Sequence, residues 1–225
     1  IKKYLNRGHS ISGTTALLNT ILHDASRTMI TEIIAKAQGF IVNPVECYQN
    51  SRGDESFVVL YFLALLAVSA VLTTGCALIG ISAVGSFTQM MPAAAVPPAL
   101  FLCLLFGGII MTAVFSLWLH LWVYILGGRK GIWQTVKAVI YGMTPGLLLG
   151  WIPLIGPLFA LWSIVLQILG IRELQEISSG RAILALFIAV VVPLMLLILL
   201  ALYFMVNTVA FSTIPAAPEN YVYPI

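Results

Sequence analysis

Residues 182–205 read AILALFIAVVVPLMLLILLALYFM, and this segment decides the fold class. It carries no charged side chain and is longer than the roughly 20 apolar residues that a helix needs to cross a hydrocarbon core about 30 Å thick. The whole chain of 225 residues is 60% hydrophobic and 8% charged, whereas an ordinary soluble domain is about 25% charged. The sequence therefore predicts an all-α integral membrane protein.

Four more apolar runs precede this segment, at residues 57–84, 99–126, 134–151 and 158–171. With residues 182–205 they predict a membrane domain over residues 56–206, built as a bundle of about five transmembrane helices. The third run is barely long enough to span, and Pro153 and Pro157 separate it from the fourth. The pair forms either a full hairpin or one that turns back within the outer leaflet. Residues 207–225 are predicted to form an extended outer tail.

Residues 1–55 are more polar and are predicted to form a cytoplasmic segment with an amphipathic helix over about residues 14–38. Apolar side chains such as Leu18, Ile21 and Leu22 recur there at helical spacing, and polar side chains occupy the opposite face. The helix is too polar to span a membrane. It either lies along the cytoplasmic leaflet or docks its apolar face onto the bundle or a partner.

The basic residues predict the orientation. If the N-terminus is cytoplasmic, all 11 Lys and Arg residues fall on the cytoplasmic side, as the positive-inside rule requires. The C-terminal tail then lies outside. Lys137, near the start of the third run, is expected to snorkel to the cytoplasmic headgroups.

The sequence offers no residues for intramembrane chemistry. Its apolar runs contain no Asp, Glu or Arg, and the chain lacks the HExxH, nucleophile-elbow and phosphate-loop motifs. Cys47, Cys76 and Cys103 have no CxxC spacing and are interpreted as small hydrophobic residues. The net charge of +3 is too weak to suggest nucleic-acid binding. We therefore expect no enzyme activity, no catalytic residue, no cofactor and no metal.

Small and polar residues form two stripes that predict helix-packing faces. In the second run the stripe ends at His120, and in the fourth run it includes Gln167, so the two side chains could hydrogen-bond across the bundle. The alternative is that His120 is a proton-sensitive or ligand-contacting group. The third run adds a GxxxG motif. The predicted packing residues are Gly108, Thr112, Ser116, Gly146, Gly150, Gly156, Ala160, Ser163 and Gly170.

Several short segments resemble the Yip family, the Ypt/Rab-interacting membrane proteins, and in particular its bacterial and archaeal members. They are Asn43-Pro44 to Tyr48, Tyr141-Gly142-Met143-Thr144-Pro145, Ile152-Pro153-Leu154-Ile155-Gly156, Leu161-Trp162, Leu169-Gly170-Ile171 and Ser179-Gly180-Arg181-Ala182. The resemblance covers about residues 40–203. It implies five membrane helices, a cytoplasmic N-terminus, no enzyme activity and, here, the plasma membrane of a bacterium or archaeon. A small GTPase partner is not expected, because the acidic cytoplasmic region of the eukaryotic relatives has no clear counterpart in this chain.

The two stripes predict helix packing, and the sequence offers no residues for catalysis. Together these observations favour a non-enzymatic membrane scaffold or adaptor, which would associate with membrane lipids and with a protein partner or a second copy. The outer tail has apolar residues that could contact such a partner. One alternative is a small channel or transporter, suggested by the Pro-broken third and fourth runs. Another is a lipid-organising protein. The predicted tail contacts are Phe211, Ile214, Tyr221 and Tyr223.

Overall fold

The structure is a computed structural model that describes residues 2–51, 55–79 and 95–212, with side chains placed from residue 20 to residue 208 within these ranges. Every regular element in them is a helix. The predicted tail contacts Ile214, Tyr221 and Tyr223 lie outside the described residues, and the side chain of Phe211 does too.

Four helices are long and apolar enough to cross a membrane, which places the chain among integral membrane proteins. They are α3 (Glu55–Leu78), α5 (Val96–Ile125), α8 (Gly156–Gln175) and α9 (Ser179–Ser212). Helix α9 continues past residue 207, where the extended tail was predicted to begin, because residues 207–212 contain neither Gly nor Pro.

The third predicted run is two short helices, α6 (Ile132–Gly142) and α7 (Thr144–Leu149), which meet at Met143. Pro145 lies in the first turn of α7. Proline has no N–H to bond the preceding turn and its ring crowds that turn's carbonyl, so the run cannot continue as one regular helix. Of the about five predicted transmembrane helices, four are therefore confirmed as candidate membrane spans, and the third run is a broken element.

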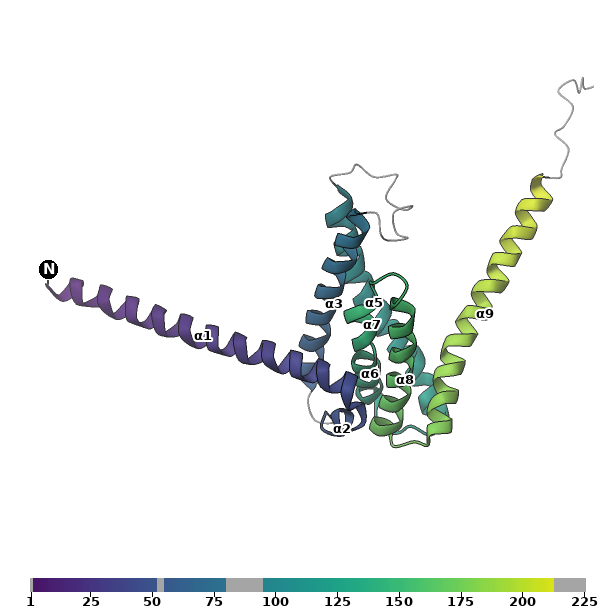
Figure 1. Ribbon diagram of the computed structural model, residues 1–225, viewed down its shortest axis with the longest axis horizontal. Helices are drawn as coiled ribbons and strands as arrows, with labels where there is room; N and C mark the ends of the chain where they lie inside the picture. The colour runs from purple at the N-terminus through teal and green to yellow at the C-terminus, as the bar shows by residue number, and fades with distance from the viewer. Residues whose placement is uncertain (1, 52–54, 80–94, 213–225) are drawn as a thin grey trace, which may run out of the picture.

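Helices α6 and α7 lie beside α8 as a hairpin, and their connecting turn stops short of the far ends of α3 and α9 (Figure 1). The opposite end of the bundle contains the α5–α6 and α8–α9 connections and carries basic side chains. We call it the basic end. Its basic residues are Arg129, Lys130, Arg172 and Arg181.

At the basic end, α1 (Lys2–Val42) and α2 (Pro44–Gln49) precede the bundle. Helix α1 contains the predicted amphipathic helix but is longer, and it projects sideways from the bundle (Figure 1). The amphipathic helix was expected to end at about residue 38. It ends instead at Val42, because Asn43 precedes a proline and is forced out of the helical region, with φ −137° and ψ 72°.

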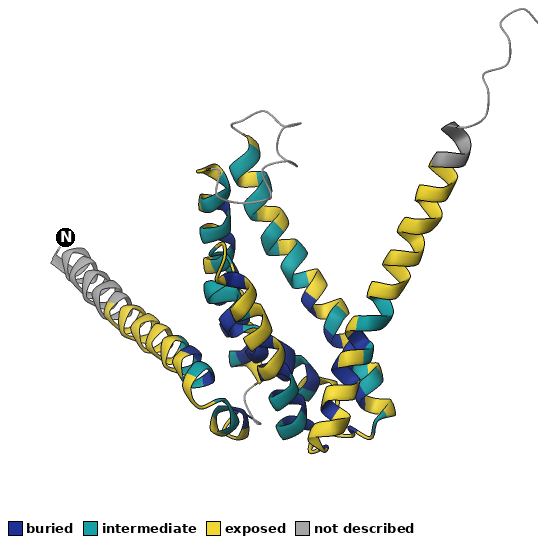
Figure 2. Ribbon diagram, turned by 45° about the vertical axis from the view of Figure 1, so that its right-hand side comes forward, coloured by how far each residue is buried: buried dark blue, intermediate teal, exposed yellow. Residues whose placement is uncertain are grey.

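Burial is concentrated toward the basic end. Helix α9 packs there against α5 and α8 through small residues such as Ala182, Ala185 and Ala189, and Trp118 Nε1 donates a 2.9 Å hydrogen bond to the Ala189 carbonyl. Farther along, α9 leans away from the bundle, and every residue from 194 to 208 is exposed (Figure 2). We call the part of the bundle toward the basic end, where the buried residues gather, the packed half. The open half is the remainder, which includes residues 194–208 of α9.

Candidate functional site

An aromatic cluster forms the centre of the packed half. Phe40 from α1, Tyr48 from α2, Tyr61 from α3 and Tyr141 from α6 are all fully buried. The Phe40 and Tyr141 rings stack with centroids 4.4 Å apart, and the Tyr61 and Tyr141 rings meet edge to face at 5.3 Å. The cluster therefore ties the N-terminal helices to the membrane bundle, as aromatic contacts of this geometry stabilise a pair beyond its burial.

Tyr48 makes polar contacts that fix α2 against the hairpin. Its hydroxyl donates a 3.0 Å hydrogen bond to the Leu166 carbonyl of α8, and a weaker contact of 3.4 Å reaches the Ala138 carbonyl of α6. A Cβ at Gly170 would lie 2.7 Å from the Tyr48 ring, so the ring requires a glycine at that position. Burial raises the pKa of the Tyr48 phenol well above its usual value, so the group stays neutral and donates.

Two lysines lie at the same level as the cluster. The Lys36 ammonium is 4.9 Å from the Phe57 ring centroid and 5.4 Å from that of Tyr141, within cation–π range. Lys137 is fully buried. The expectation that Lys137 snorkels to headgroups is wrong, because the periodicity of α6 turns this side chain into the bundle, with its neighbours Ala138 and Val139 also buried.

Polar side chains clamp the α5–α6 connection to α8. Gln175 Nε2 donates to the Gly131 carbonyl at 2.8 Å and to Thr135 Oγ1 at 2.9 Å, and its Oε1 accepts from the Lys130 backbone N–H at 3.1 Å. His120 Nδ1 lies 2.8 Å from Thr135 Oγ1 and joins the same network. Gln175 is 2% exposed, so the side chain at the centre of the clamp is buried.

The predicted pair of His120 and Gln167 is not formed, because His120 bonds Thr135 instead. Gln167 lies farther from the basic end. It lines a hollow of about 310 Å³ together with Met143, Gly146, Ala160 and Ser163. The two side chains do not meet, because α6 lies between their helices and supplies the hydroxyl that His120 uses.

The predicted packing residues mostly line the contacts within the hairpin. The Gly146 N–H donates to Ser163 Oγ at 2.9 Å, and a Cβ at Gly156 would lie 2.4 Å from the Gly150 carbonyl oxygen. Gly142, which was not among them, allows α6 to approach the α8 backbone closely at Gln167. On the α5 side, a Cβ at Gly108 would lie 2.7 Å from Leu66, Thr112 Oγ1 lies 3.8 Å from Met143 Sδ, and Ser116 is 1% exposed.

The three cysteines are free thiols in different surroundings. Cys47 lies against Gly39 where α1 meets α2, and Cys76 is half-buried in α3. Burial raises the pKa of the Cys47 thiol, which disfavours the reactive thiolate. Cys103 is exposed on α5. Among the residues that the structure describes, no three His, Cys, Asp or Glu side chains gather as metal ligands.

One of the comparisons with known proteins identifies a family. The model of the Yip1 domain matches residues 39–202, from the last turn of α1 to the open half of α9. The chain belongs to the Yip1-domain family. The matched region includes the aromatic cluster, the Gln175 clamp and the hairpin. Comparisons with curated proteins and with solved structures return no significant match.

Sequence reasoning missed the centre of this Yip1 domain. Tyr141-Gly142 and Asn43-Pro44 to Tyr48 carried the family resemblance, but nothing in their local pattern indicated that the two segments meet. Gln175 follows the charged pair Arg172-Glu173, and that hydrophilic context hid its buried role. Helical spacing could have indicated this role. Leu174 and Gln175 lie four residues after Gly170 and Ile171 and continue the same buried face of α8.

Proposed function

We propose that this Yip1-domain protein is a non-enzymatic membrane scaffold or adaptor, and that α1 is the arm through which it associates with another protein or a second copy. The family acts in membrane trafficking and is not known for enzymatic activity. We further propose that it resides in the plasma membrane of a bacterium or archaeon, with its basic end and N-terminus cytoplasmic, because that orientation places the basic residues inside.

The observation that carries the proposal is the division of α1 into an anchored and a projecting part. Ala37 and Phe40 are buried against the bundle, whereas Ile21, Leu22 and Met29 are 64%, 60% and 44% exposed. Leu22, Met29 and Phe40 lie on one face, since 3.6 residues make a turn. The docking face of α1 therefore continues outward as an apolar stripe, as expected of a helix that binds a groove or another helix.

The test is the mass and composition of the full-length protein extracted in native nanodiscs from its source membrane. A double variant, Leu22→Glu with Met29→Glu, places two charges on the stripe. Its matched control is Thr31→Glu with Gln38→Glu, which adds the same charge to the opposite face of α1. We expect the wild type and the control to retain a stoichiometric partner or second copy, and the stripe variant to lose it.

A lone monomer for the wild type would contradict the scaffold proposal, and an assembly that survives the stripe variant would show that α1 is not the arm. The outer tail remains a second candidate contact. Deletion of residues 211–225 tests it in the same measurement, and retention of all co-purifying proteins after that deletion would exclude the tail.

One observation favours a second candidate function, membrane organisation. Helix α1 extends across the direction of the spanning helices (Figure 1), as an amphipathic helix embedded in a leaflet surface does. Reconstitution into large vesicles, followed by electron microscopy, tests this candidate. Smaller, curved vesicles with the wild type but not with the Leu22→Glu, Met29→Glu variant would support it, and unchanged vesicles would rule it out.

A further inference from the structure

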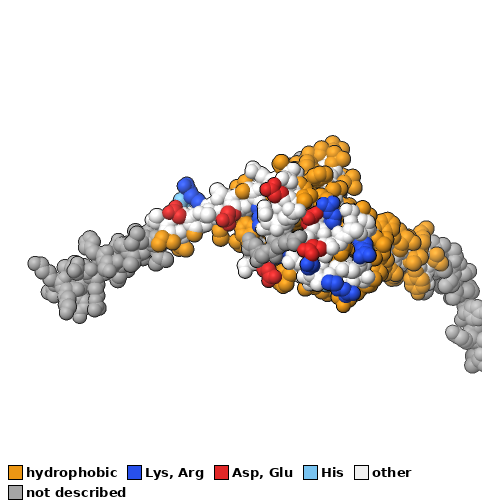
Figure 3. Space-filling model, turned by 90° about the horizontal axis from the view of Figure 1, so that it is seen from below, with side chains coloured by type: hydrophobic (Ala, Val, Ile, Leu, Met, Phe, Trp, Pro, Cys, Tyr) orange, Lys and Arg blue, Asp and Glu red, His pale blue; other side chains and the backbone are white. Residues whose placement is uncertain are grey.

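Two guanidinium groups lie against the turn that ends α5. The Arg129 Cζ lies 3.8 Å from the centroid of the Tyr124 ring, and Arg181 Nη1 would be 3.3 Å from a Cβ on Gly127. Gly127 has φ +104° and begins the turn, so the Arg181 group from the start of α9 and the Arg129 group that follows α5 both lie beside this turn. Both arginines are exposed, and Figure 3 shows charged side chains gathered over this end of the molecule.

These two arginines differ from their basic neighbours. Lys130 pairs with Glu176 at 2.5 Å and Arg172 pairs with Glu173 at 2.5 Å. Across the described ranges, Arg129 and Arg181 form no ion pair with a carboxylate, so their charge is available to an external anion. The ring of Tyr124 holds the Arg129 guanidinium in place, which lowers the entropy lost when that group binds.

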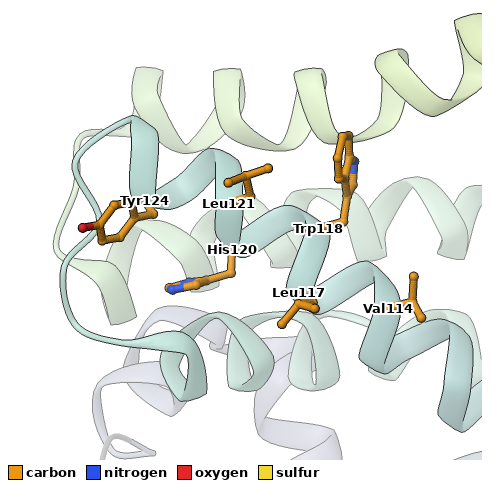
Figure 4. A pocket seen from close by; sticks show the side chains of 6 residues that line it. All are labelled: Val114, Leu117, Trp118, His120, Leu121 and Tyr124. Carbon is orange, nitrogen blue, oxygen red and sulfur yellow. The ribbon is translucent and has the colours of Figure 1, made fainter.

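An apolar groove begins at the same tyrosine and follows α5 away from the basic end. It has a volume of about 520 Å³ and is lined by Val114, Leu117, Trp118, His120, Leu121 and Tyr124 (Figure 4). The His120 ring is held by Thr135, so this part of the wall is fixed.

The length of the groove matches one leaflet. From Val114 to Tyr124 there are ten residue steps, or about 15 Å at roughly 1.5 Å per residue in a helix. Half of a hydrocarbon core of about 30 Å is the same length. Guanidinium groups suit a phosphate. Arg129 stacks on Tyr124 at the end of the groove where a headgroup would be, and Arg181 lies beside the adjoining turn at Gly127.

We propose that this surface binds one anionic phospholipid from the leaflet at the basic end. Arg129 and Arg181 hold the phosphate, and an acyl chain lies in the groove on α5. The site involves neither α1 nor the outer tail, so it goes beyond the scaffold proposal and does not depend on it.

The test is native mass spectrometry of the full-length protein in detergent, titrated with phosphatidylglycerol or with phosphatidylcholine of the same chains. We expect one phosphatidylglycerol to bind in preference. The double variant Arg129→Gln, Arg181→Gln should weaken its affinity about tenfold or more. The control Arg27→Gln, Lys130→Gln removes the same charge, including that of the neighbouring but ion-paired lysine, and should retain the affinity within about twofold.

Two results would overturn the phosphate assignment: no loss of affinity in the Arg129, Arg181 variant, or an equal loss in the control, which would indicate attraction by overall charge. A second arm tests the groove. Leu117→Trp should weaken phosphatidylglycerol binding, whereas Leu63→Trp on the exposed face of α3 should not. Soluble glycerol phosphate at the same concentration should not displace the lipid, and displacement would show a phosphate site without an acyl-chain groove.

Discussion

The packed and open halves of the bundle are both built from apolar helices, but they differ in how closely those helices approach one another. In the packed half, helices approach through Gly142, Gly146 and Gly170, and the buried polar groups of Tyr48, Ser163 and Gln175 form hydrogen bonds between helices. In the open half, α9 presents Leu, Ile, Met and Phe on all sides with few small residues. Lipid chains are as apolar as leucine, so such a surface gains little by packing against another helix. Specific helix–helix packing is therefore confined to the packed half. In the open half, the surface of α9 needs only contact with lipid.

The largest expected effect comes from closing the glycine contact between α6 and α8. A Cβ at Gly142 would lie 2.4 Å from Gln167 Cγ and 2.9 Å from the Gln167 backbone nitrogen, and backbone cannot move aside like a side chain. Gly142→Val should therefore lower the free energy of unfolding by about 3 kcal/mol or more, at the upper end for overpacking. Thermal unfolding of the detergent-solubilised protein, followed by circular dichroism, measures it.

Gly107→Val is the matched control, because a Cβ at Gly107 meets no atom within 4 Å. It should change the stability by less than about 0.5 kcal/mol. Similar losses in the two variants would remove the distinction between tight and loose glycine positions and with it the division into two halves.

A leucine-to-alanine pair compares the two halves directly. Leu119 of α5 is fully buried in the packed half, and Leu197 of α9 is 63% exposed in the open half. Leu119→Ala leaves a cavity and should cost about 2 to 3 kcal/mol, at the low end for core leucines because lipid is the outside solvent. Leu197→Ala should cost less than about 0.5 kcal/mol. The same thermal measurement applies, and equal shifts would mean that α9 packs along its whole length.

The Gln175 clamp should have the next largest effect. Gln175→Leu removes hydrogen bonds to the Gly131 carbonyl, Thr135 Oγ1 and the Lys130 N–H. The loss should be about 2 kcal/mol, since each of the three bonds is worth about 0.5 to 1 kcal/mol net, at the low end because Lys130 and Gly131 are exposed and can bond water in the variant. The connection from α5 to α6 should also exchange its amide hydrogens faster. Gln38→Leu, on the exposed face of α1, is the control, and unchanged exchange in Gln175→Leu would show that the clamp does not hold the connection.

The sequence predicted the membrane class and most of the helices because these depend on local quantities, namely hydropathy and helical period. It predicted both ends of α5 and α8 and the starts of α3 and α9 to within about four residues, whereas α9 ends at Ser212 rather than at residue 205. It did not predict the break at Met143, although Pro145 was visible, because proline is often tolerated in membrane helices. The partners of Tyr48, His120 and Gln175 are set by how helices cross, and no single helix contains that information.

The smallest expected effect at neutral pH, and the most specific, is that of Tyr48→Phe. The variant loses the 3.0 Å bond to the Leu166 carbonyl, which already has a helical partner, so the cost should be only about 1 kcal/mol. The wild type should also lose stability in alkali. The unfolded phenol ionises near pH 10, whereas burial keeps the folded pKa higher. The stabilising contribution is therefore complete below about pH 10 and is lost as the pH rises toward the folded pKa.

Tyr48→Phe removes this ionisation, so the difference in stability between wild type and variant should shrink above pH 10. Unfolding midpoints at pH 8 and at pH 11 measure the change. Tyr203→Phe, whose ring is 63% exposed in the open half, should reproduce the wild type at both pH values. If Tyr203→Phe and Tyr48→Phe behaved alike, the Tyr48 hydroxyl would not distinguish the halves. If only Tyr48→Phe departs from the wild type, the contact between α2 and the hairpin is part of the stable fold, and the anchored end of α1 depends on it.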